Sequence, residues 1–560
     1  MATVRELADG YIEQMAVLDP IEATRWGVAG VEDQLPDLSP DGLEERAGLQ
    51  RRTLAALAST ATTGDGDRVA AEVMAERLGA SVELHDFGDD FRSLRVLHSP
   101  HGEVRQCFDL MRLETEADWQ TVGARLARVP AALEGFRTSL REGLTRGIVS
   151  ARRQVVACAA QCDVWGGLGD AGSSFFAGLV RRYPGGPSSG ALEREASSAA
   201  FAYLELGDWL REQYLPGATP VDAAGRERYA LAARYYTGSE LDLEDTYAFG
   251  WAELHRIDER MAAVCAQILP GASRREVIEH LESDPAHVVE GVDAFRRWNQ
   301  DLIDTTVAAL DGAHFDIPGP IRRCEAMIAP PGGASAMYYT GPSEDLTRPG
   351  RTWYPTLGKT RFPLWREVSI CFHEGVPGHH LQVAQVRYLA DRLNRFQRLA
   401  GFTSGHGEGW ALYAERLMGE LGFLEDPAFE LGMLSAQAMR AVRVIVDIGM
   451  HLELEIPHDQ PYDAGEPYHP GERWTPEIAL PFVVERSCFP EDFMSSEVDR
   501  YLGLPGQAIS YKVGERVWLE SREAAKARKG SSFDLKQFHQ YALDLGHMGL
   551  DQLTRELEHY

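Results

Sequence analysis

The chain has 560 residues and a formal net charge of −29, from 56 lysines and arginines against 85 aspartates and glutamates. Nucleic acids and anionic membranes are bound by basic surfaces, so this acidic balance argues against both as partners. A hydrophobic content of 44% and a charged content of 25% are typical of a soluble globular protein. Because a single core usually holds about 100–200 residues, we expect the chain to form more than one structural region.

The sequence contains no recognisable targeting or membrane-spanning segment. Residues 1–10 lack the apolar centre of a secretory signal, and no stretch approaches about eighteen uncharged apolar residues. The seven cysteines are scattered without a C-x-x-C pair. Cys158 and Cys162 lie one helical turn apart in an apolar segment and are expected to be buried thiols. These features predict a cytoplasmic protein.

The N-terminal third is expected to be helical. Ser39 and Pro40 mark a helix start, because proline is favoured at the first helical position. A stretch rich in glycine, serine and proline runs from Gly166 to Gly190 and predicts a loop or hinge. We therefore predict an N-terminal helical region over 1–190, forming the wall of a cleft, and a catalytic region over 191–560.

Helical patterns resume after this hinge and give way to short strands near residue 322. The last of these helices, over 241–269, should end at Pro270 and Gly271, which stop it. Short apolar or aromatic runs separated by proline and glycine then predict a small sheet around 322–357. Its expected strands are 326–329, 336–340 and 352–355.

The densest group of chemically active residues follows this predicted sheet, at the end of an amphipathic helical run over 362–371. It places the imidazoles of His373, His379 and His380 and the carboxylate of Glu374 within eight residues. Neutral imidazole is the commonest protein ligand of zinc, and a glutamate beside the first ligand is where a general base lies in zinc peptidases. The pattern predicts a metal site; the alternative is a histidine-rich helix end that binds no metal.

The spacing of these histidines requires a break in the helix. His379 and His380 follow His373 by a rise of about 9 or 10.5 Å on a straight helix. That is too far for ligands that each lie about 2 Å from one ion. Pro377 and Gly378 supply the break, because proline removes a backbone donor and glycine tolerates the resulting dihedrals. If two residues loop out, His379 becomes the second ligand, and His380 points toward substrate or supports the ligands from behind.

Two later segments carry further candidates. Thr403 or Ser404 can cap a helix that presents Glu408 in its first turn and Glu415 two turns later on the same face. A long apolar-faced helix over 427–456 carries polar groups at helical spacing. These groups either orient metal ligands or form an internal ion-pair network; they are Arg440, Arg443, Asp447 and His451.

The segment from His373 to Gln382 resembles the H-E-x-x-P-G-H-H signature of a bacterial family long labelled only as a domain of unknown function. That family is similar to the gluzincin metallopeptidases, especially the Taq-type carboxypeptidases and the oligopeptidases. Their H-E-x-G-H motif aligns on Gly378-His379, with two extra residues here before the glycine. From about residue 320 onward, the resemblance implies a mainly α fold with a small β-sheet beside a deep active-site cleft.

The resemblance also implies roles outside the motif. The third gluzincin ligand is a glutamate on a separate downstream helix, often next to small residues, which matches Glu408; Glu415 is its rival. The element from Ser510 to Gly514 is similar to the P-[ST]-Y-x-L-G element of Taq-type carboxypeptidases. By that similarity Tyr511 would donate to the oxyanion that forms during hydrolysis, and Tyr501 is its rival.

The remaining candidates concern substrate. In gluzincin-like clefts an edge strand pairs with extended substrate, and by analogy Tyr338 and Tyr339 are the candidate edge. A small structural sheet is an equal alternative. Arg500 and Lys512 are candidates to hold a substrate carboxylate; the alternative for each is a structural role. His380 and Tyr501 complete the predicted substrate-binding set.

Together these residues predict a zinc-dependent hydrolase of peptide or amide bonds in short peptides, with one zinc ion per chain. His373, His379 and Glu408 would hold the ion, Glu374 would act as general base and Tyr511 would stabilise the oxyanion. Two alternatives stay open. One is a hydrolase of a specialised small-molecule amide that uses the same site, and the other is an inactive binding protein on the same scaffold.

Overall fold

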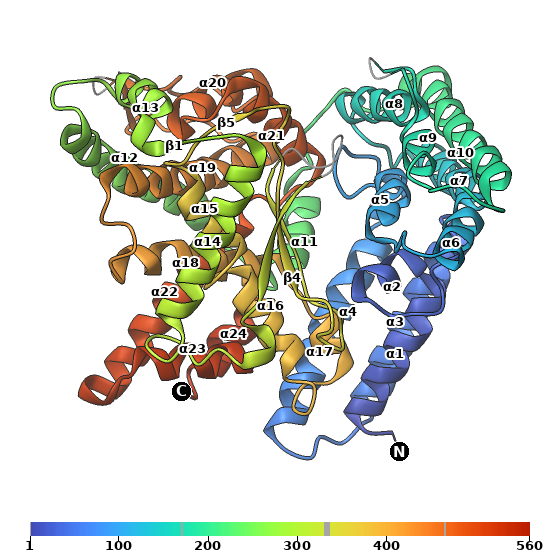
Figure 1. Ribbon diagram of the computed structural model, residues 1–560, viewed down its shortest axis with the longest axis horizontal. Helices are drawn as coiled ribbons and strands as arrows, with labels where there is room; N and C mark the ends of the chain where they lie inside the picture. The colour runs from blue at the N-terminus through green and yellow to red at the C-terminus, as the bar shows by residue number, and fades with distance from the viewer. Residues whose placement is uncertain (1, 170–171, 330–335, 464–465) are drawn as a thin grey trace. The chain divides into compact units, whose positions relative to one another are not determined.

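The computed structural model describes residues 2–169, 172–329, 336–463 and 466–560, and these residues are mainly helical, as the sequence predicted (Figure 1). They separate into two compact units. The first comprises Met1–Leu231 and Ser496–Leu504, and the second comprises Ala232–Ser495 and Pro505–Tyr560. Every strand among the described residues belongs to the second unit.

The first unit is built from helices that begin at strong capping signals. Thr3 caps α1 in a capping box with Glu6, and Ser39 caps α3 with Pro40 in its first turn, as predicted. The helices are α1 (Val4–Leu18), α2 (Pro20–Trp26), α3 (Pro40–Ala58), α4 (Asp65–Asp86), α5 (Pro100–Gln106), α6 (Glu116–Leu126), α7 (Val129–Arg146), α8 (Arg152–Gly166), α9 (Phe175–Val180) and α10 (Ser189–Trp209).

The glycine-rich stretch before residue 190 lies inside the first unit and does not divide the chain. Leu192 and Tyr203 of α10 are buried in the same core as Val155 and Cys158 of α8. Removing α10 from the unit would expose this shared core, so the division falls at Leu231 and not near residue 190. The expected burial of Cys158 and Cys162 is confirmed, and both thiols are free.

The second unit surrounds one long buried helix, α19 (Pro427–Leu452). Almost every α19 residue from Leu431 to His451 is buried, which is the pattern of a helix packed on all sides. Helices α12, α15 and α20 pack against it, and α18 packs along α22. The helices are α11 (Arg226–Thr237), which begins in the first unit, α12 (Leu243–Ile268), α13 (Arg274–Ser283), α14 (Val292–Leu310), α15 (Glu367–Glu374), α16 (His379–Tyr388), α17 (Arg395–Leu399), α18 (Ser404–Glu420), α20 (Pro476–Ser487), α21 (Glu491–Gly503), which ends in the first unit, α22 (Ser510–Lys529), α23 (Leu535–Asp544) and α24 (Leu550–Leu557).

The predicted small sheet is present in the second unit. Strand β2 (Cys324–Ile328) pairs in parallel with β4 (Gly350–Tyr354), and β3 (Tyr338–Thr340) pairs antiparallel with the other edge of β4. Within the described residues β3 has β4 as its single partner and is therefore an edge strand. Two further pairs are β1 (Val288–Glu290) with β5 (Arg361–Pro363), and β6 (Pro461–Asp463) with β7 (Glu466–Pro467).

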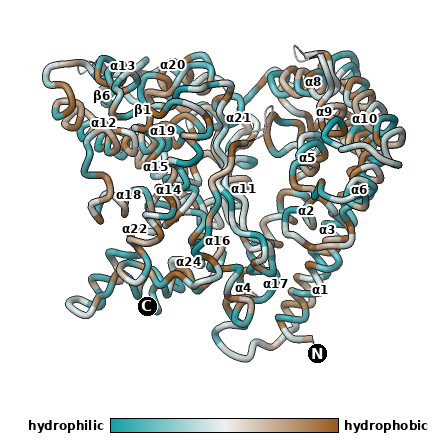
Figure 2. The backbone as a smooth tube through the Cα atoms, in the orientation of Figure 1, coloured by the Kyte–Doolittle hydropathy of each residue, from teal (hydrophilic) through white to brown (hydrophobic). Residues whose placement is uncertain are grey.

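Apolar and polar residues alternate every few residues along the helices (Figure 2). Brown and teal segments alternate along the tube, as expected for helices that bury one face. Among the described residues, no helix combines the length and apolar character needed to cross a membrane.

Candidate metal centre

The histidine motif forms a helix, a tight turn and a second helix. Helix α15 ends at Glu374 and α16 begins at His379, so the predicted break lies between them. The Gly378 amide donates to the carbonyl oxygen of Phe372 at 3.0 Å, and the Val376-Pro377 peptide bond is cis. The indole nitrogen of Trp410 on α18 donates to the Pro377 carbonyl oxygen at 2.8 Å. The turn is thus packed against the end of α15 and fixed to α18.

This turn brings three candidate ligand atoms together, from His373, His379 and Glu408. Glu408 Oε2 lies 3.3 Å from His373 Nε2 and 3.4 Å from His379 Nε2, and all three ligand atoms lie within 4.8 Å of one another. Ligands at about 2.0–2.1 Å from a tetrahedral zinc ion would be about 3.3 Å apart. The two distances from Glu408 equal that edge.

The chemistry of these donors also fits a cation. Glu408 Oε2 is buried and has no hydrogen-bond partner among the described residues. Burial alone would raise the pKa of Glu408, but the imidazoles of His379 and His373 outweigh it and lower the pKa well below its usual range. An ionised carboxylate oxygen that faces two imidazole nitrogens is a suitable metal ligand.

A second carboxylate orients the first histidine. His373 Nδ1 lies 2.8 Å from Glu415 Oε1, so Nδ1 carries the proton and Nε2 is the atom that faces Glu408. Glu415 is fully buried and also accepts a hydrogen bond from Ser369. The Arg440 guanidinium lies 3.8 Å from Glu415 Oε1. From the sequence, Glu415 was the rival of Glu408 for the third ligand position. In the structure Glu415 instead lies behind His373 and holds its Nδ1 side.

Burial and charge act in opposite directions on these groups. Burial is the largest single influence and lowers the pKa of His373, but the carboxylates of Glu408, Glu415 and Glu374 together outweigh it and raise the pKa to about 9. Glu374 is buried, and burial raises the pKa of its carboxyl although both histidines oppose the change. No hydrogen bond to the Glu374 carboxylate is found within the described residues, so its oxygens are available to a reactant.

His380 points away from the three-ligand cluster. Its Nε2 lies 2.8 Å from the Ile321 carbonyl oxygen and its Nδ1 lies 3.0 Å from the Tyr339 hydroxyl. A carbonyl oxygen can only accept, so Nε2 carries the proton and the Tyr339 hydroxyl donates to Nδ1. Burial lowers the pKa of His380 to about 4, which keeps this neutral form. Tyr338, its neighbour on β3, stacks on Trp353 at 5.8 Å.

Tyr511 lies close to the cluster. Its ring stacks on the His373 ring at 6.3 Å, and the Arg443 guanidinium lies 4.7 Å from its ring centre. Two glycines allow this approach: a Cβ on Gly409 of α18 would lie 2.4 Å from the Gly514 backbone of α22. Direct backbone packing of the two helices therefore places Tyr511 and Glu408 beside the same histidine.

The chain matches, over residues 20–557, the family described as "Bacterial protein of unknown function (DUF885)". The chain belongs to this family. It is similar to "the putative lipoprotein from Colwellia psychrerythraea", with 23% identity over 100% of this chain and 99% of that chain and a TM-score of 0.84. It is also similar to "a putative lipoprotein of unknown function from Shewanella oneidensis", with 17% identity over 99% of each chain and a TM-score of 0.73. These likenesses show a shared fold, and no curated protein matches the chain.

In this DUF885 protein the polar groups of α19 divide between two roles. Arg440 contacts Glu415 behind His373. Asp447 instead lies 3.7 Å from His451 and accepts a hydrogen bond from the Gly506 amide at 3.0 Å. The first contact lies behind the candidate ligand His373, and the second anchors the turn before α22.

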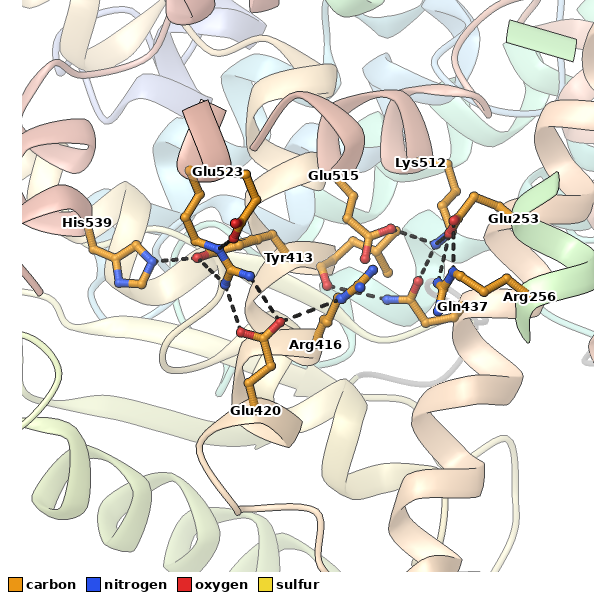
Figure 3. A network of polar contacts seen from close by, with 12 residues as sticks. Glu253, Arg256, Tyr413, Arg416, Glu420, Gln437, Lys512, Glu515, Glu523 and His539 are labelled. Atoms are coloured by element: carbon orange, nitrogen blue, oxygen red, sulfur yellow. Dashed lines mark hydrogen bonds and ion pairs between the residues drawn. The ribbon is translucent and has the colours of Figure 1, made fainter. Parts of the chain in front are cut away.

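Lys512 is far from free, although the sequence made it a candidate for a substrate carboxylate. It is fully buried, and its ammonium donates to Glu253 at 3.0 Å, to Glu515 at 2.6 Å and to Gln437 (Figure 3). A lysine has three donors, and these partners use all of them. Lys512 therefore belongs to an internal network that joins α12, α19 and α22.

Arg500 and Tyr501 belong to the first unit. The Arg500 guanidinium makes a two-pronged ion pair with Glu497, at 3.0 and 2.8 Å. The Tyr501 hydroxyl donates to the same carboxylate at 3.0 Å. Tyr511, and not its rival Tyr501, is the tyrosine that lies beside the histidine cluster within the second unit.

Proposed function

We propose that this protein is a zinc-dependent hydrolase of peptide or amide bonds in short peptides, related to the gluzincin metallopeptidases. The observation that carries the proposal is the spacing of His373 Nε2, His379 Nε2 and Glu408 Oε2, with Glu374 directly after the first ligand. A zinc ion held by these three groups would act as a Lewis acid and lower the pKa of a coordinated water toward about 7.

The remaining steps belong to side chains of this chain. Glu374 would take the proton from the attacking water and return it to the leaving amine. A carboxyl whose pKa is raised by burial is suited to both transfers. The Tyr511 hydroxyl would donate to the oxyanion of the tetrahedral intermediate, a contribution of about 3 kcal/mol for one well-placed donor. Glu415 would keep His373 in the orientation that presents Nε2.

Metal content tests the proposal. Elemental analysis should find about one zinc per chain in the wild type and in His380→Ala, but not in His379→Ala. The two variants remove neighbouring imidazoles, so each controls for the other. A peptide and small-amide screen should then show hydrolysis that Glu374→Gln abolishes without loss of zinc.

The outcomes separate the alternatives. Absence of zinc in all three proteins, even after zinc is added back, would refute the hydrolase and favour a binding protein on the same scaffold. Zinc binding with turnover of non-peptide amides alone would instead favour the specialised amide hydrolase. Cytoplasmic location stays a prediction from the sequence.

A further inference from the structure

The segment that continues strand β3 runs alongside α16, the helix that begins with the ligand His379. Near the start of α16, Tyr339 bonds to His380. Further along, a Cβ on Gly341 would lie 3.0 Å from the Val383 side chain. Still further, Glu344 is one of the charged neighbours of Arg387. The extended segment and the helix therefore proceed together from the metal cluster toward Arg387.

Arg387 is a buried cation that makes no ion pair or hydrogen bond with the residues the structure describes. It is only 8% exposed, and its Nε and Nη1 atoms are buried without a hydrogen bond. No ion pair to Arg387 is found in the described parts of the chain. The pKa of its guanidinium is lowered to about 10, mainly by burial; Arg398 and Arg348 act in the same direction, while Glu344 and Tyr339 oppose the change.

The one neighbouring carboxylate that opposes this shift is already used by other arginines. Arg395 makes a two-pronged ion pair with Glu344, at 3.1 Å for both contacts, and Arg398 contacts the same carboxylate at 3.1 Å. Arg387 therefore adds a positive charge beside Arg395 and Arg398, which already form ion pairs with the Glu344 carboxylate. This local excess stands out in a chain with a net charge of −29.

A second buried polar side chain without a hydrogen-bond partner among the described residues lies on α16, between His379 and Arg387 in sequence. Gln382, on the second turn of α16, is 1% exposed, and both its Oε1 and its Nε2 are buried without a partner among the described residues. Buried polar groups and charges are normally paired, because leaving them unpaired is costly. Gln382 lies about 140° around α16 from Arg387, so the two groups face different sides of the helix. The guanidinium is the charged one of the two and is the group that calls for an anionic ligand.

We propose that Arg387 binds a carboxylate of the substrate. Guanidinium is the group best suited to a carboxylate, because its planar fork matches the two oxygens. Eight residues separate His379 from Arg387, which corresponds to about 12 Å along α16. An extended peptide covers about 3.3 Å per residue, so the carboxylate would lie roughly three to four residues from the scissile bond.

This inference rests on the proposed function for its reaction and adds the substrate class to it. The substrates are short peptides or amides that carry a free α-carboxylate, or an acidic side chain, at that distance. The anion site also differs from the one expected from the sequence, because Lys512 and Arg500 are both fully engaged with carboxylates of their own. Arg387 has no such partner in the described part of the chain and takes over that role.

Binding to the zinc-free protein tests the inference without any turnover. Isothermal titration calorimetry would compare three probes: N-acetyl-tetraalanine with a free carboxylate, its C-terminal amide, and the amide of N-acetyl-Ala-Ala-Ala-Glu. We expect the free acid to bind at least about tenfold more tightly than its amide. The glutamate-containing amide shows whether a side-chain carboxylate substitutes for the terminal one.

Three variants make the test specific. Arg387→Gln should remove the preference for the carboxylate, and Arg387→Lys should retain part of it because the charge remains. Arg260→Gln is the matched control, since Arg260 is paired with Glu430 at 2.6 and 2.8 Å on the surface of the second unit. Because Arg387 makes no ion pair or hydrogen bond with any residue that the structure describes, its replacement should not lower the thermal midpoint of the free protein.

Equal binding of acid and amide by the wild type, or an unchanged preference in Arg387→Gln, would overturn the inference. A fall in the thermal midpoint of Arg387→Gln without a change in preference would assign Arg387 a structural role instead. Zinc content is measured in parallel. A carboxylate preference in a protein that takes up no zinc when zinc is added back would defeat the proposed hydrolase and leave the anion site standing, and zinc uptake without the preference would do the reverse.

Discussion

Replacing Gly378 by alanine should disturb the metal cluster through the backbone, without touching a ligand. A Cβ at this position would lie 2.0 Å from the His373 carbonyl oxygen and 2.4 Å from the Phe372 carbonyl oxygen. Real Cβ atoms essentially never approach closer than 3.0 Å, so the turn and the end of α15 would have to separate by at least 1.0 Å. Both obstructing atoms are backbone atoms of a packed helix and cannot rotate away.

A shift of this size is large compared with the geometry of the site. The ligand atoms of His373 and His379 lie 3.3 and 3.4 Å from Glu408, and a displacement of 1 Å moves one histidine out of coordination range. We expect zinc affinity to fall on the order of 10–100-fold, as for other changes that misdirect a ligand. Overpacking of the turn should also cost about 1–3 kcal/mol of stability.

Zinc affinity would be measured by competition with a chromophoric chelator, and folding by circular dichroism and thermal unfolding. Gly419→Ala on α18 is the control, because its Cβ would meet nothing closer than a Leu424 methyl at 3.7 Å. That control should keep wild-type zinc affinity and gain up to about 1 kcal/mol of helix stability. Wild-type zinc affinity in a folded Gly378→Ala variant would refute the argument that this turn sets the ligand spacing.

Three further predictions concern other parts of the chain. Glu415→Ala should reduce zinc affinity on the order of 10–100-fold, because His373 loses the partner of its Nδ1 atom. Glu420→Ala, at the exposed end of the same helix, should leave zinc affinity unchanged. Equal zinc affinities of the two variants in a chelator competition would contradict this role of Glu415. Tyr511→Phe should lower kcat on the order of 100-fold with unchanged zinc content, and steady-state kinetics with unaltered kcat would exclude the tyrosine as oxyanion donor. Burial lowers the pKa of His101 to about 4 and of His539 to about 3, so between those values and about 6.5 these histidines bind more protons in the unfolded chain than in the folded one. Their contribution to stability should therefore fall as pH drops below about 6.5, by at most about 3 kcal/mol for His101. A thermal midpoint that rises from pH 7 to pH 5 would contradict this.

The helix break and its histidines could be predicted because the information is local. The rise per residue of a helix excludes His373 and an unbroken partner six residues later. Pro377 and Gly378 act on the backbone where they stand. The structure places the break there, brings His379 to the cluster and turns His380 away. The strands after Cys324 were predictable for the same reason, since their aromatic runs are bounded by proline and glycine.

Contacts between distant segments could not be predicted in this way. Lys512 follows the candidate Tyr511 in sequence, but its partners Gln437 and Glu253 lie 75 and 259 residues away. Glu415 shares a helix face with Glu408, yet its support of His373 depends on how α15 packs against α18. The division at Leu231 likewise depends on which core α10 enters. No local pattern carries these facts.

Helix α16 connects the two proposals through one backbone feature. The turn at Gly378 ends α15 and sets the direction in which α16 leaves the metal cluster. His379 begins that helix and Arg387 lies on its last turn, so the same turn fixes both the proposed second ligand and its distance to a guanidinium that has no partner among the described residues. A regular helix has little freedom in length, so the separation of about 12 Å does not adapt to the substrate. A substrate that uses both ends must therefore match this spacing, and the anion site would select substrates by length as well as by charge.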